Sequence, residues 1–404
     1  MDKQFSNNFI CCTFVRRNLK ECLLHNSFKK GILWNVLYNK GCYMINFTVG
    51  PVQMDDETRE IGKEQIPYFR TKEFSELMKE NEKILCNLFD APSDSKVIFM
   101  TGSGTASMES SIMNFFTSRD KVLVINGGSF GERFVELCQI HEIPFTEIKL
   151  NYGQPLTKQI LSKYENQNFT GFAVQLCETS TGVLYDMNMI GDFCKRNNIF
   201  LLVDAVSGFM ADYFSMKKMN VNAAITGSQK ALALPPSMSF TVLDEKAIER
   251  CKEVNPKTLY FNYQNYLKNM ERGQTPFTPA VGTLIQLNEK LKRIERTGGI
   301  SKQNEIAKER AKYFRNKIKK LPLKLFVEEE NASNCVTALM PTKKGVNAHK
   351  IFEIIKDEYD IWICPNGGEM SDKVFRVGHI GAITNEEIDK LIKVFEDLAD
   401  REIL

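Results

Sequence analysis

The sequence predicts an α/β fold in which helices cover both faces of a mainly parallel sheet, followed by a smaller α+β domain. Three observations predict it. From residue 46 onward, apolar runs of strand length alternate with segments of helical periodicity. Most of these runs are apolar on both faces, as buried parallel strands are. After about residue 290 the pattern changes to a long charged helix followed by shorter strands and helices.

The expected elements of the larger domain follow one another regularly. A first helix is expected around residues 74–88, because its apolar side chains recur at helical spacing and form one face. A strand at 96–100 then leads through a glycine-rich turn into a helix at 108–116. Further strands are expected at 122–125, 145–150, 172–176, 199–203, 223–226 and 239–243, with helices between most of them, for example at 130–140 and 187–195.

The smaller domain is expected to begin with a helix over residues 300–320. Its last helix begins at Thr384-Asn-Glu-Glu387, a capping box in which each end residue can bind the backbone amide of the other. Between them we expect strands at 323–327, 336–340, 361–364 and 374–377 and a helix at 347–357. The expected division is a basic extension (1–43), a large domain (44–290, with an N-terminal arm at 44–60) and a small domain (291–404).

Composition and charge argue against several classes of protein. The 404 residues are 43% hydrophobic and 25% charged, which is ordinary for a globular chain. The net charge of +3 is too small to indicate binding to nucleic acid or to an anionic membrane surface. Residues 1–43 carry a net charge of +5, so the rest of the chain carries −2. No apolar run approaches the roughly 20 residues that a membrane span needs.

The cysteines and the first segment bear on the compartment. The 11 cysteines include no CxxC pair and no zinc-ligand spacing, so we expect no metal site and free thiols in a reducing, cytoplasmic compartment. The first segment has apolar residues followed by arginines, the reverse of a signal peptide, and it lacks the serine richness of a transit peptide. We therefore expect Met44 to be the natural start and residues 1–43 to have little functional weight.

Three local features can carry chemistry. The stretch from Thr101 to Ser107 joins a strand to a helix, and the backbone of Gly104 with the hydroxyls of Ser103 and Thr105 can hold a phosphate there. Asp204 ends an apolar strand, at the edge where open α/β sheets bind their ligands. Lys230 lies among small and apolar residues, where desolvation lowers the pKa of an amine and makes it a usable nucleophile.

Each feature alone has a simpler explanation, namely a glycine turn that caps a helix, an aspartate that caps the next turn and a solvent-exposed lysine. Their order favours chemistry, because the phosphate loop is followed by a strand-end carboxylate and, 26 positions later, by a buried amine. These are the groups that pyridoxal phosphate requires. The carboxylate keeps the pyridine nitrogen protonated, and the amine condenses with the aldehyde.

Three stretches carry a family resemblance: Asn46-Phe-Thr-Val-Gly-Pro51, Ser228-Gln-Lys230 and Phe375-Arg-Val-Gly-His-Ile-Gly381. They resemble the class V, fold-type-I aminotransferases, close to the alanine/serine–glyoxylate and 2-aminoethylphosphonate–pyruvate group, over residues 45–400. The resemblance implies pyridoxal 5′-phosphate as cofactor, a seven-stranded sheet and a homodimer. It also implies ping-pong transfer of an amino group from alanine, serine or 2-aminoethylphosphonate to glyoxylate or pyruvate.

The resemblance further implies roles for individual residues. Phe130 matches the aromatic residue that stacks on the cofactor ring, and Thr179 or Ser180 matches the residue that reaches the phenolic oxygen of the ring. Arg376 matches the arginine that clamps the substrate carboxylate. The residues that it adds to the phosphate site are Ser228, Gln229 and, from the other subunit, Thr278.

Two alternative functions stay open. Cysteine desulfurases typically have histidine before the lysine, where this chain has Gln229, and a catalytic cysteine on a mobile loop. Cys335 lies in the corresponding stretch, but its surroundings alternate like a buried strand. A catalytically silent relative should lose the lysine first, and this chain retains Lys230. One departure from the family pattern is Ser237, where glycine is usual after the double proline, so the turn beyond the lysine can differ in shape.

Overall fold

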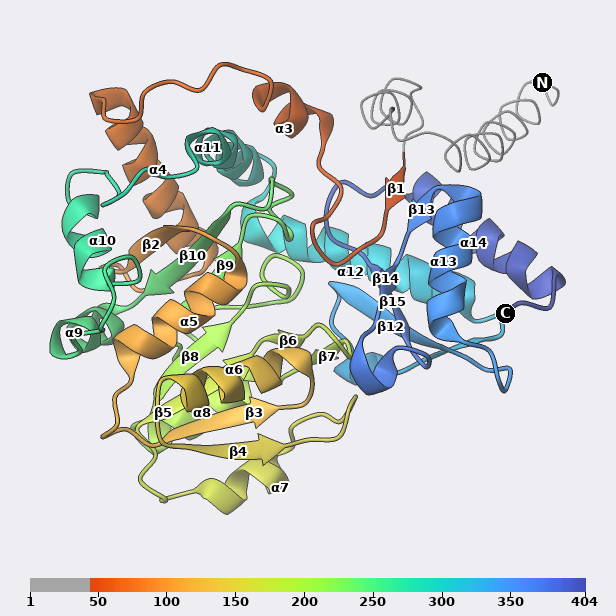
Figure 1. Cartoon of the computed structure of the whole chain (residues 1–404), viewed down its shortest axis with the longest axis horizontal. Coiled ribbons are helices and arrows are strands. Elements are labelled where there is room, and N and C mark those ends of the chain that lie inside the picture. Colours follow the sequence, from red (N-terminus) through yellow and green to blue (C-terminus); the bar gives the residue numbers. More distant parts are fainter. Residues whose placement is uncertain (1–43) are drawn as a thin grey trace, which may run out of the picture.

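The computed structural model describes residues 44–404, and the expectations for residues 1–43 lie outside the described residues. Figure 1 shows two packed parts that are built on different sheets. The larger part contains a seven-stranded sheet with the order β2-β10-β9-β8-β5-β3-β4. Within it, β10 is antiparallel to both neighbours and the other pairs are parallel. The α/β class and the mainly parallel sheet are therefore as predicted.

The strands of this sheet match the predicted strands to within one residue at either end. Because successive side chains of a strand point to opposite faces, each strand contributes to two cores. Val97 and Phe99 of β2 belong to one core, for example, and Ile98 and Met100 belong to the other. The strands are β2 (Lys96–Thr101), β3 (Val122–Asn126), β4 (Phe145–Lys149), β5 (Gly171–Gln175), β8 (Phe200–Asp204), β9 (Ala223–Gly227) and β10 (Met238–Leu243).

Helices cover both faces of the sheet. One face carries α4 (Lys72–Leu88), α8 (Met187–Arg196) and α11 (Val281–Arg296). The other carries α5 (Gly104–Phe115), α6 (Ser129–Ile140), α9 (Glu245–Glu253) and α10 (Tyr263–Met270). Helix α11 runs through position 290, and its buried Leu291 and Ile294 belong to the core of the larger part, so the expected domain boundary lies inside this helix.

The smaller part is a four-stranded antiparallel sheet with its own core. Its order is β11-β12-β15-β14, and helices pack against it. The elements are α12 (Gly299–Ile318), β11 (Leu323–Leu325), β12 (Val336–Pro341), α13 (Ala348–Tyr359), β14 (Cys364–Pro365), β15 (Phe375–Gly378) and α14 (Asn385–Asp400). The capping box at Thr384 and Glu387 is confirmed, with both reciprocal hydrogen bonds present at 2.9 and 3.2 Å.

The arm that precedes the large sheet connects the two parts. β1 (Ile45–Asn46) pairs in parallel with β13 (Ile361–Trp362), and in Figure 1 the chain then passes to α3 (Asp56–Ile61) beside α11. The single strand expected at 361–364 is therefore two strands, because residues 361–362 pair with the arm and residues 364–365 pair with β15.

The remaining short elements complete the described chain. They are β6 (Cys177–Glu178), β7 (Val183–Leu184), α7 (Lys158–Leu161), η1 (Ser162–Tyr164), η2 (Glu329–Asn331) and η3 (Gly368–Met370). No helix within residues 44–404 is both long enough and apolar enough to cross a membrane.

Candidate active site

Lys230 lies in the turn after β9, and only 9% of its surface is exposed. Its Nζ atom donates a hydrogen bond to the carbonyl oxygen of Val49, at 2.7 Å. The next residue of the arm, Gly50, packs against the lysine so closely that a Cβ atom there would lie 2.7 Å from Cδ and 2.9 Å from Nζ. Gly50 also has a φ of +139°, which favours glycine. The arm therefore covers the lysine, and a larger residue at position 50 would displace one of the two.

The environment of Lys230 favours an uncharged amine. Burial lowers the pKa of Lys230 below its ordinary value, and the positive charge of Arg376 acts in the same direction. Cys335, Cys364 and Asp204 oppose this shift. An amine with a lowered pKa has a larger uncharged fraction near neutral pH, so it can act as a nucleophile or as a base.

Asp204 ends β8 at the carboxyl edge of the sheet and is 6% exposed. One carboxylate oxygen accepts the backbone N–H of Val206 at 2.9 Å, and no ion pair to this carboxylate occurs within residues 44–404. Burial raises the pKa of Asp204 to about 6, although the Val206 N–H and the charges of Lys230 and Arg133 oppose the shift. A carboxylate in these surroundings is stabilised by any cation that comes to lie beside it.

The glycine-rich loop lies beside Asp204. Ser103 precedes α5 and is exposed, and its side chain makes no capping hydrogen bond. Gly104 begins the helix, and a Cβ atom at this position would lie 3.1 Å from the side chain of Val206, two residues after Asp204. The first N–H groups of a helix have no partner within the helix and lie at the positive end of its dipole. The loop can therefore hold a phosphate close to the Asp204 carboxylate.

Glu178 is a site residue that the sequence reasoning missed. It is fully buried, and its carboxylate accepts the backbone N–H groups of Phe130 and Gly131, at 3.2 and 3.0 Å, at the start of α6. The hydroxyl of Ser180 also donates to it, at 2.5 Å. Burial raises the pKa of Glu178, and these hydrogen bonds oppose the shift. Glu178 thus fixes the start of α6 and with it the half-buried ring of Phe130.

Arg133 is a second residue that was not predicted, and it connects three that were. Its Nη1 atom donates to the hydroxyl of Thr105 at 3.1 Å, and its guanidinium carbon lies 5.0 Å from the ring centroid of Phe130. Its positive charge also opposes the raised pKa of Asp204. The helical spacing of Phe130 and Arg133 on α6 is the only sequence signal that links them.

Arg376 on β15 reaches across from the small sheet to the larger part. Its Nη1 and Nη2 atoms donate to the carbonyl oxygens of Thr179 and Pro365, at 3.0 and 2.7 Å. Its Nε atom is buried without a partner among the described residues. The hydroxyl of Thr179 donates to Ser207 at 2.7 Å, while its carbonyl supports the arginine. Both acceptors are carbonyl oxygens, so the charge of Arg376 has no counter-ion among residues 44–404, which suits the binding of a carboxylate.

The polar residues near the lysine differ in whether their side chains already have hydrogen-bond partners. The hydroxyl of Ser228 donates to the carbonyl oxygen of Pro235 at 2.6 Å and accepts the N–H of Met238 at 3.2 Å, so it is engaged within its own turn. Gln229 has a buried Oε1 atom without a partner among the described residues. Ser237, the departure from the family pattern, is accommodated because its hydroxyl lies 2.7 Å from that of Thr283 on α11.

Thr278 lies outside this group on the surface of the chain. It is exposed, but the segment that carries it borders the glycine-rich loop, because the N–H of Ala280 donates to the hydroxyl of Thr101 at 3.2 Å. The structure therefore brings together Lys230, Asp204, the glycine-rich loop, α6 and Arg376. It leaves Thr278 at the edge of this group.

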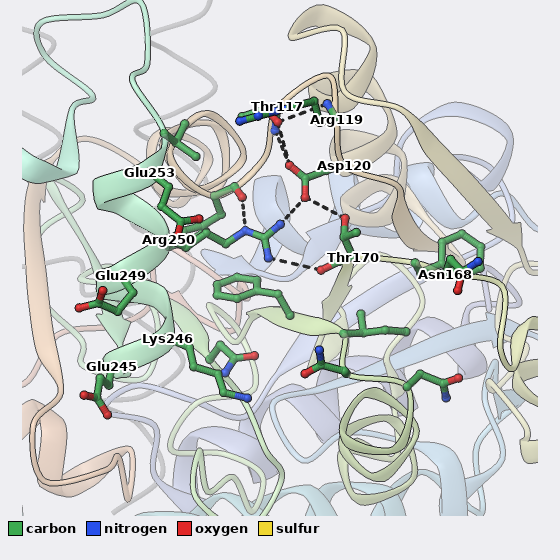
Figure 2. A pocket seen from close by; sticks show the side chains of 18 residues that line it. Thr117, Arg119, Asp120, Asn168, Thr170, Glu245, Lys246, Glu249, Arg250 and Glu253 are labelled. Carbon is green, nitrogen blue, oxygen red and sulfur yellow. Dashed lines mark hydrogen bonds and ion pairs between the residues drawn. The ribbon is translucent and has the colours of Figure 1, made fainter.

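Two other features can be set apart from this site. Cys335 is fully buried with its Sγ atom 3.5 Å from that of Cys177, so it does not lie on an exposed loop. A cavity of about 1050 Å³ lies elsewhere, beside α9 (Figure 2). There Arg250 forms an ion pair with Asp120 and also donates to the carbonyl oxygen of Thr170, so the central charges of this cavity are already matched.

Comparison with known proteins agrees with this fold. The structure of an alanine–glyoxylate aminotransferase from Nostoc sp. superimposes with a TM-score of 0.83 at 23% sequence identity, covering 88% of this chain and 95% of that one. The fold is therefore that of the fold-type-I aminotransferases. The family description "Aminotransferase class-V" matches residues 67–391, so the chain belongs to the class V aminotransferase family. It is an enzyme of the transaminase class.

Two curated relatives show how the family varies. The soluble hydrogenase 42 kDa subunit of Anabaena cylindrica is 32% identical over 334 residues, which cover 81% of this chain and 85% of that protein. The L-aspartate–glyoxylate aminotransferase of Paracoccus denitrificans is 28% identical over 299 residues, which cover 72% of this chain and 74% of that protein.

Proposed function

We propose that the protein is a pyridoxal 5′-phosphate-dependent aminotransferase that moves an amino group from alanine, serine or 2-aminoethylphosphonate to glyoxylate or pyruvate. One observation carries the proposal. The buried amine of Lys230 shares its electrostatic surroundings with a carboxylate that lacks a cation, Asp204, and a guanidinium that lacks an anion, Arg376. A cationic ring nitrogen and a substrate carboxylate would satisfy these two needs.

The residues fit the cofactor. The N–H groups of Gly104 and Thr105 and the hydroxyl of Ser103, which have no hydrogen-bond partner within residues 44–404, suit its phosphate. The Oε1 atom of Gln229, beside the lysine, is a buried acceptor that also has no partner in the described chain. Asp204 would bind the ring nitrogen and keep it protonated, and Phe130 would stack on the ring. Pyridoxal phosphate, when bound, would supply the electron sink that makes the α-proton of an amino acid acidic.

The chain itself would then perform three tasks. Lys230 would hold the cofactor, and its uncharged amine would take up the proton from the α-carbon of the amino donor as a general base. Arg376 binds the carboxylate of the donor and afterwards that of the oxo acid, so both reactants use one position. Because the first product leaves before the second substrate binds, the kinetics should be ping-pong.

The donor and acceptor can be identified by one screen. Cofactor-loaded enzyme is assayed with alanine, serine, aspartate and 2-aminoethylphosphonate, each against pyruvate and glyoxylate. Activity with a small donor and either oxo acid supports the proposal. A chain that transfers from none of them, while it binds the cofactor, would indicate a silent relative. Release of sulfide and alanine from cysteine would indicate a desulfurase instead.

A homodimer is the second part of the proposal. The exposed apolar side chains of the described residues include Ile66, Tyr68, Leu259 and Tyr260. Two of them lie beside the segment that carries Thr278, because Tyr260 stacks on Phe277 and Ile66 lies 3.5 Å from the position of a Cβ atom at Gly282. Such a surface suits a partner subunit, whose Thr278 would close the phosphate site. Light scattering tests the dimer, and activity recovered on mixing Lys230→Ala with Thr278→Ala subunits tests whether the site is shared.

Two further proposals concern the chain as a whole. The seven cysteines within residues 44–404 are all free, which supports a reducing, cytoplasmic compartment. We also propose that residues 1–43 are dispensable, and that the chain forms a large and a small domain whose boundary, expected near residue 290, falls within α11.

A further inference from the structure

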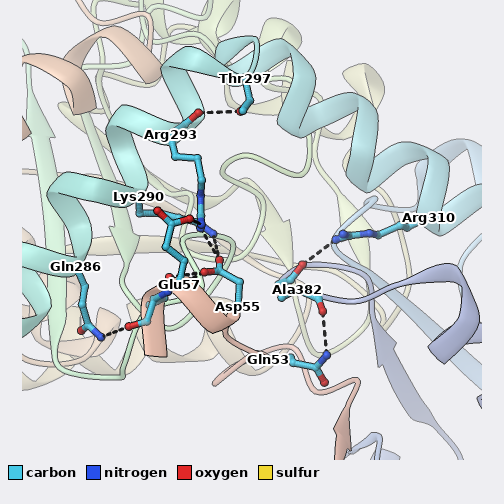
Figure 3. A network of polar contacts seen from close by, with 11 residues as sticks. Gln53, Asp55, Glu57, Gln286, Lys290, Arg293, Thr297, Arg310 and Ala382 are labelled. Atoms are coloured by element: carbon cyan, nitrogen blue, oxygen red, sulfur yellow. Dashed lines mark hydrogen bonds and ion pairs between the residues drawn. The ribbon is translucent and has the colours of Figure 1, made fainter. Parts of the chain in front are cut away.

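A second cavity lies where the arm, α11, α12 and the loop after β15 meet. Its volume is about 210 Å³, and Figure 3 shows Lys290 and Asp55 on one side of this region and Arg310 on the other. None of the predicted site residues lines it, but Ala231, which follows the catalytic candidate Lys230, does. The polar lining consists of Asp55, Lys290, Gln303, Arg310 and His379.

Arg310 brings a positive charge that no carboxylate in the described chain pairs with. Its Nη1 atom donates to the carbonyl oxygens of Gly381 and His379, at 2.8 and 3.4 Å, and its Nε and Nη2 atoms have no partner within residues 44–404. The negative charge of Glu387 acts on Arg310. The carboxylate of Glu387 is already engaged by the side chain of Gln53, at 3.0 Å, and by the N–H of Thr384, at 2.9 Å. Burial lowers the pKa of Arg310, and Glu387 opposes this shift, but an arginine stays charged.

His379 adds a neutral donor, as its hydrogen bonds indicate. The hydroxyl oxygen of Thr337 accepts the Nε–H of Arg315 at 3.0 Å and lies 2.7 Å from Nε2 of His379. The one hydrogen of this hydroxyl has Nε2 as its acceptor among the described residues, so His379 carries its own hydrogen on Nδ1. Burial lowers the pKa of His379 well below its ordinary value, which keeps the ring neutral. Nδ1 is buried without a partner in the described chain.

The remaining charges in the lining do not satisfy these donors. Asp55 is occupied by Lys290 and Arg293, whose nitrogens lie 2.7 and 2.5 Å from its Oδ2 atom. Lys290 uses one of its three hydrogens in this pair. The lining therefore holds two cations and one anion, with N–H groups of Lys290, Arg310 and His379 left without acceptors among residues 44–404.

We propose that this cavity is a binding site for a small anion, either inorganic phosphate or a carboxylate of two or three carbons, held by Arg310 and His379 with support from Lys290. The volume fits such an ion and excludes a nucleotide or a larger acid. An oxyanion accepts several hydrogen bonds at once and neutralises the unpaired guanidinium. This site goes beyond the proposed amino transfer and does not depend on it.

The position of the site links the anion to the arm. The side chain of Gln53 donates to the carbonyl oxygen of Ala382 at 2.9 Å (Figure 3). The N–H of Ala382 donates to the backbone carbonyl oxygen of Gln53, also at 2.9 Å. Four residues earlier, the carbonyl of Val49 holds Lys230. A bound anion would tighten the small part against the arm, so it should raise thermal stability and alter the substrate KM rather than supply a step of the reaction.

Calorimetric titration of the cofactor-loaded enzyme tests the proposal, with inorganic phosphate in one arm and acetate in the other. The titration in which heat of binding is observed identifies the class of ion. Arg310→Gln should weaken this binding by about ten- to a hundredfold, as expected for the loss of a charge-assisted donor set. Arg310→Lys should keep part of it. Arg376→Gln, which alters the substrate clamp, should remove only acetate binding at that clamp and leave the Arg310-dependent binding unchanged.

Three outcomes overturn the proposal. They are no binding of either ion up to about 20 mM, equal binding by wild type and Arg310→Gln, and loss of binding in Arg376→Gln but not in the Arg310 variants. If Arg310→Gln does not fold, His379→Leu provides the second test, because it removes a neutral donor and leaves the charge in place. A rise in melting temperature with phosphate that disappears in His379→Leu supports the site, and a rise that persists in full contradicts it.

Discussion

The Nζ atom of Lys230 lies 2.7 Å from the carbonyl oxygen of Val49, although 181 positions separate the two residues in the sequence. The bond makes the N-terminal arm part of the candidate active site. It also gives the amine a fixed position when it is not attached to the cofactor, because the carbonyl can accept one of its hydrogens. Gly50 follows and leaves just enough room for the lysine side chain.

Gly50→Ala should therefore impair the site without unfolding the protein. The new methyl group would meet three atoms of the Lys230 side chain at 2.9 Å or less, at a φ that strains an alanine. We expect affinity for the cofactor to fall at least tenfold, measured by titration of the cofactor-free enzyme and the absorbance of the loaded one. Gly367→Ala is the matched control, since nothing lies within 4 Å of a Cβ atom there. Equal losses in both variants would contradict the account.

Lys230 should be the only lysine that becomes labelled by the cofactor. Reduction of the loaded enzyme with borohydride, followed by peptide mapping, should place the pyridoxyl group on Lys230, because its amine is buried and has a lowered pKa. Lys290, which is half-buried and has a lowered pKa but is paired with Asp55, is the internal control and should remain unlabelled. A label on any other lysine would disprove the assignment.

Asp204→Asn should fold normally and lose turnover. An amide cannot hold the ring nitrogen in its protonated form, so the electron sink is lost and we expect kcat to fall by about 10²-fold or more. Turnover assays with the best donor of the screen measure this, and circular dichroism checks the fold. Near wild-type turnover in the Asn variant would show that Asp204 does not serve the ring nitrogen.

The same variant makes a prediction about stability and pH in the cofactor-free enzyme. Burial raises the pKa of Asp204 from 3.8 to about 6, so the folded state binds the proton more tightly than the unfolded state does. The contribution of this carboxyl group to the free energy of unfolding therefore decreases as the pH rises from 3.8 to about 6. In urea unfolding, the free energy of unfolding of Asp204→Asn should rise relative to that of wild type by about 1–2 kcal/mol between pH 5 and pH 7.5. An unchanged difference would mean that the carboxylate is not desolvated.

Arg376→Ala should still bind the cofactor but should use its substrates poorly. Removing one partner of a buried charge pair costs about 2–5 kcal/mol, so kcat/KM should fall by about two to three decades for both the amino donor and the oxo acid. The competing account, in which Arg376 only ties the small part to Thr179, predicts a lower melting temperature with nearly unchanged kinetics. Measuring both quantities on this variant separates the two accounts.

The fold was largely predictable because local composition decides it. The central strands are apolar on both faces, and the capping box at Thr384 is encoded within four residues, so pattern alone located them. The division of residues 361–365 into two strands was not predictable, because it depends on pairing with Ile45 and Phe375 from distant parts of the chain.

The site shows the same limit. Lys230 and Asp204 could be proposed as site residues from the sequence, because a charged residue at the end of an apolar strand stands out. Glu178, Arg133 and Val49 were missed, because what each of them does is fixed by a partner brought close only by folding. Val49 acts through its backbone carbonyl, which every residue has, so its residue type gives no indication of this contact.

The most direct test of the central claim, that Lys230 carries out amino transfer, is a single-turnover measurement. Cofactor-loaded enzyme is mixed with the best amino donor in the absence of any oxo acid, and the oxo acid released is quantified. We predict one equivalent per active site for wild type, and release slower by at least about three orders of magnitude for Lys230→Ala loaded with the same cofactor. Equal release by the two enzymes, or none from wild type with any donor, would contradict the account.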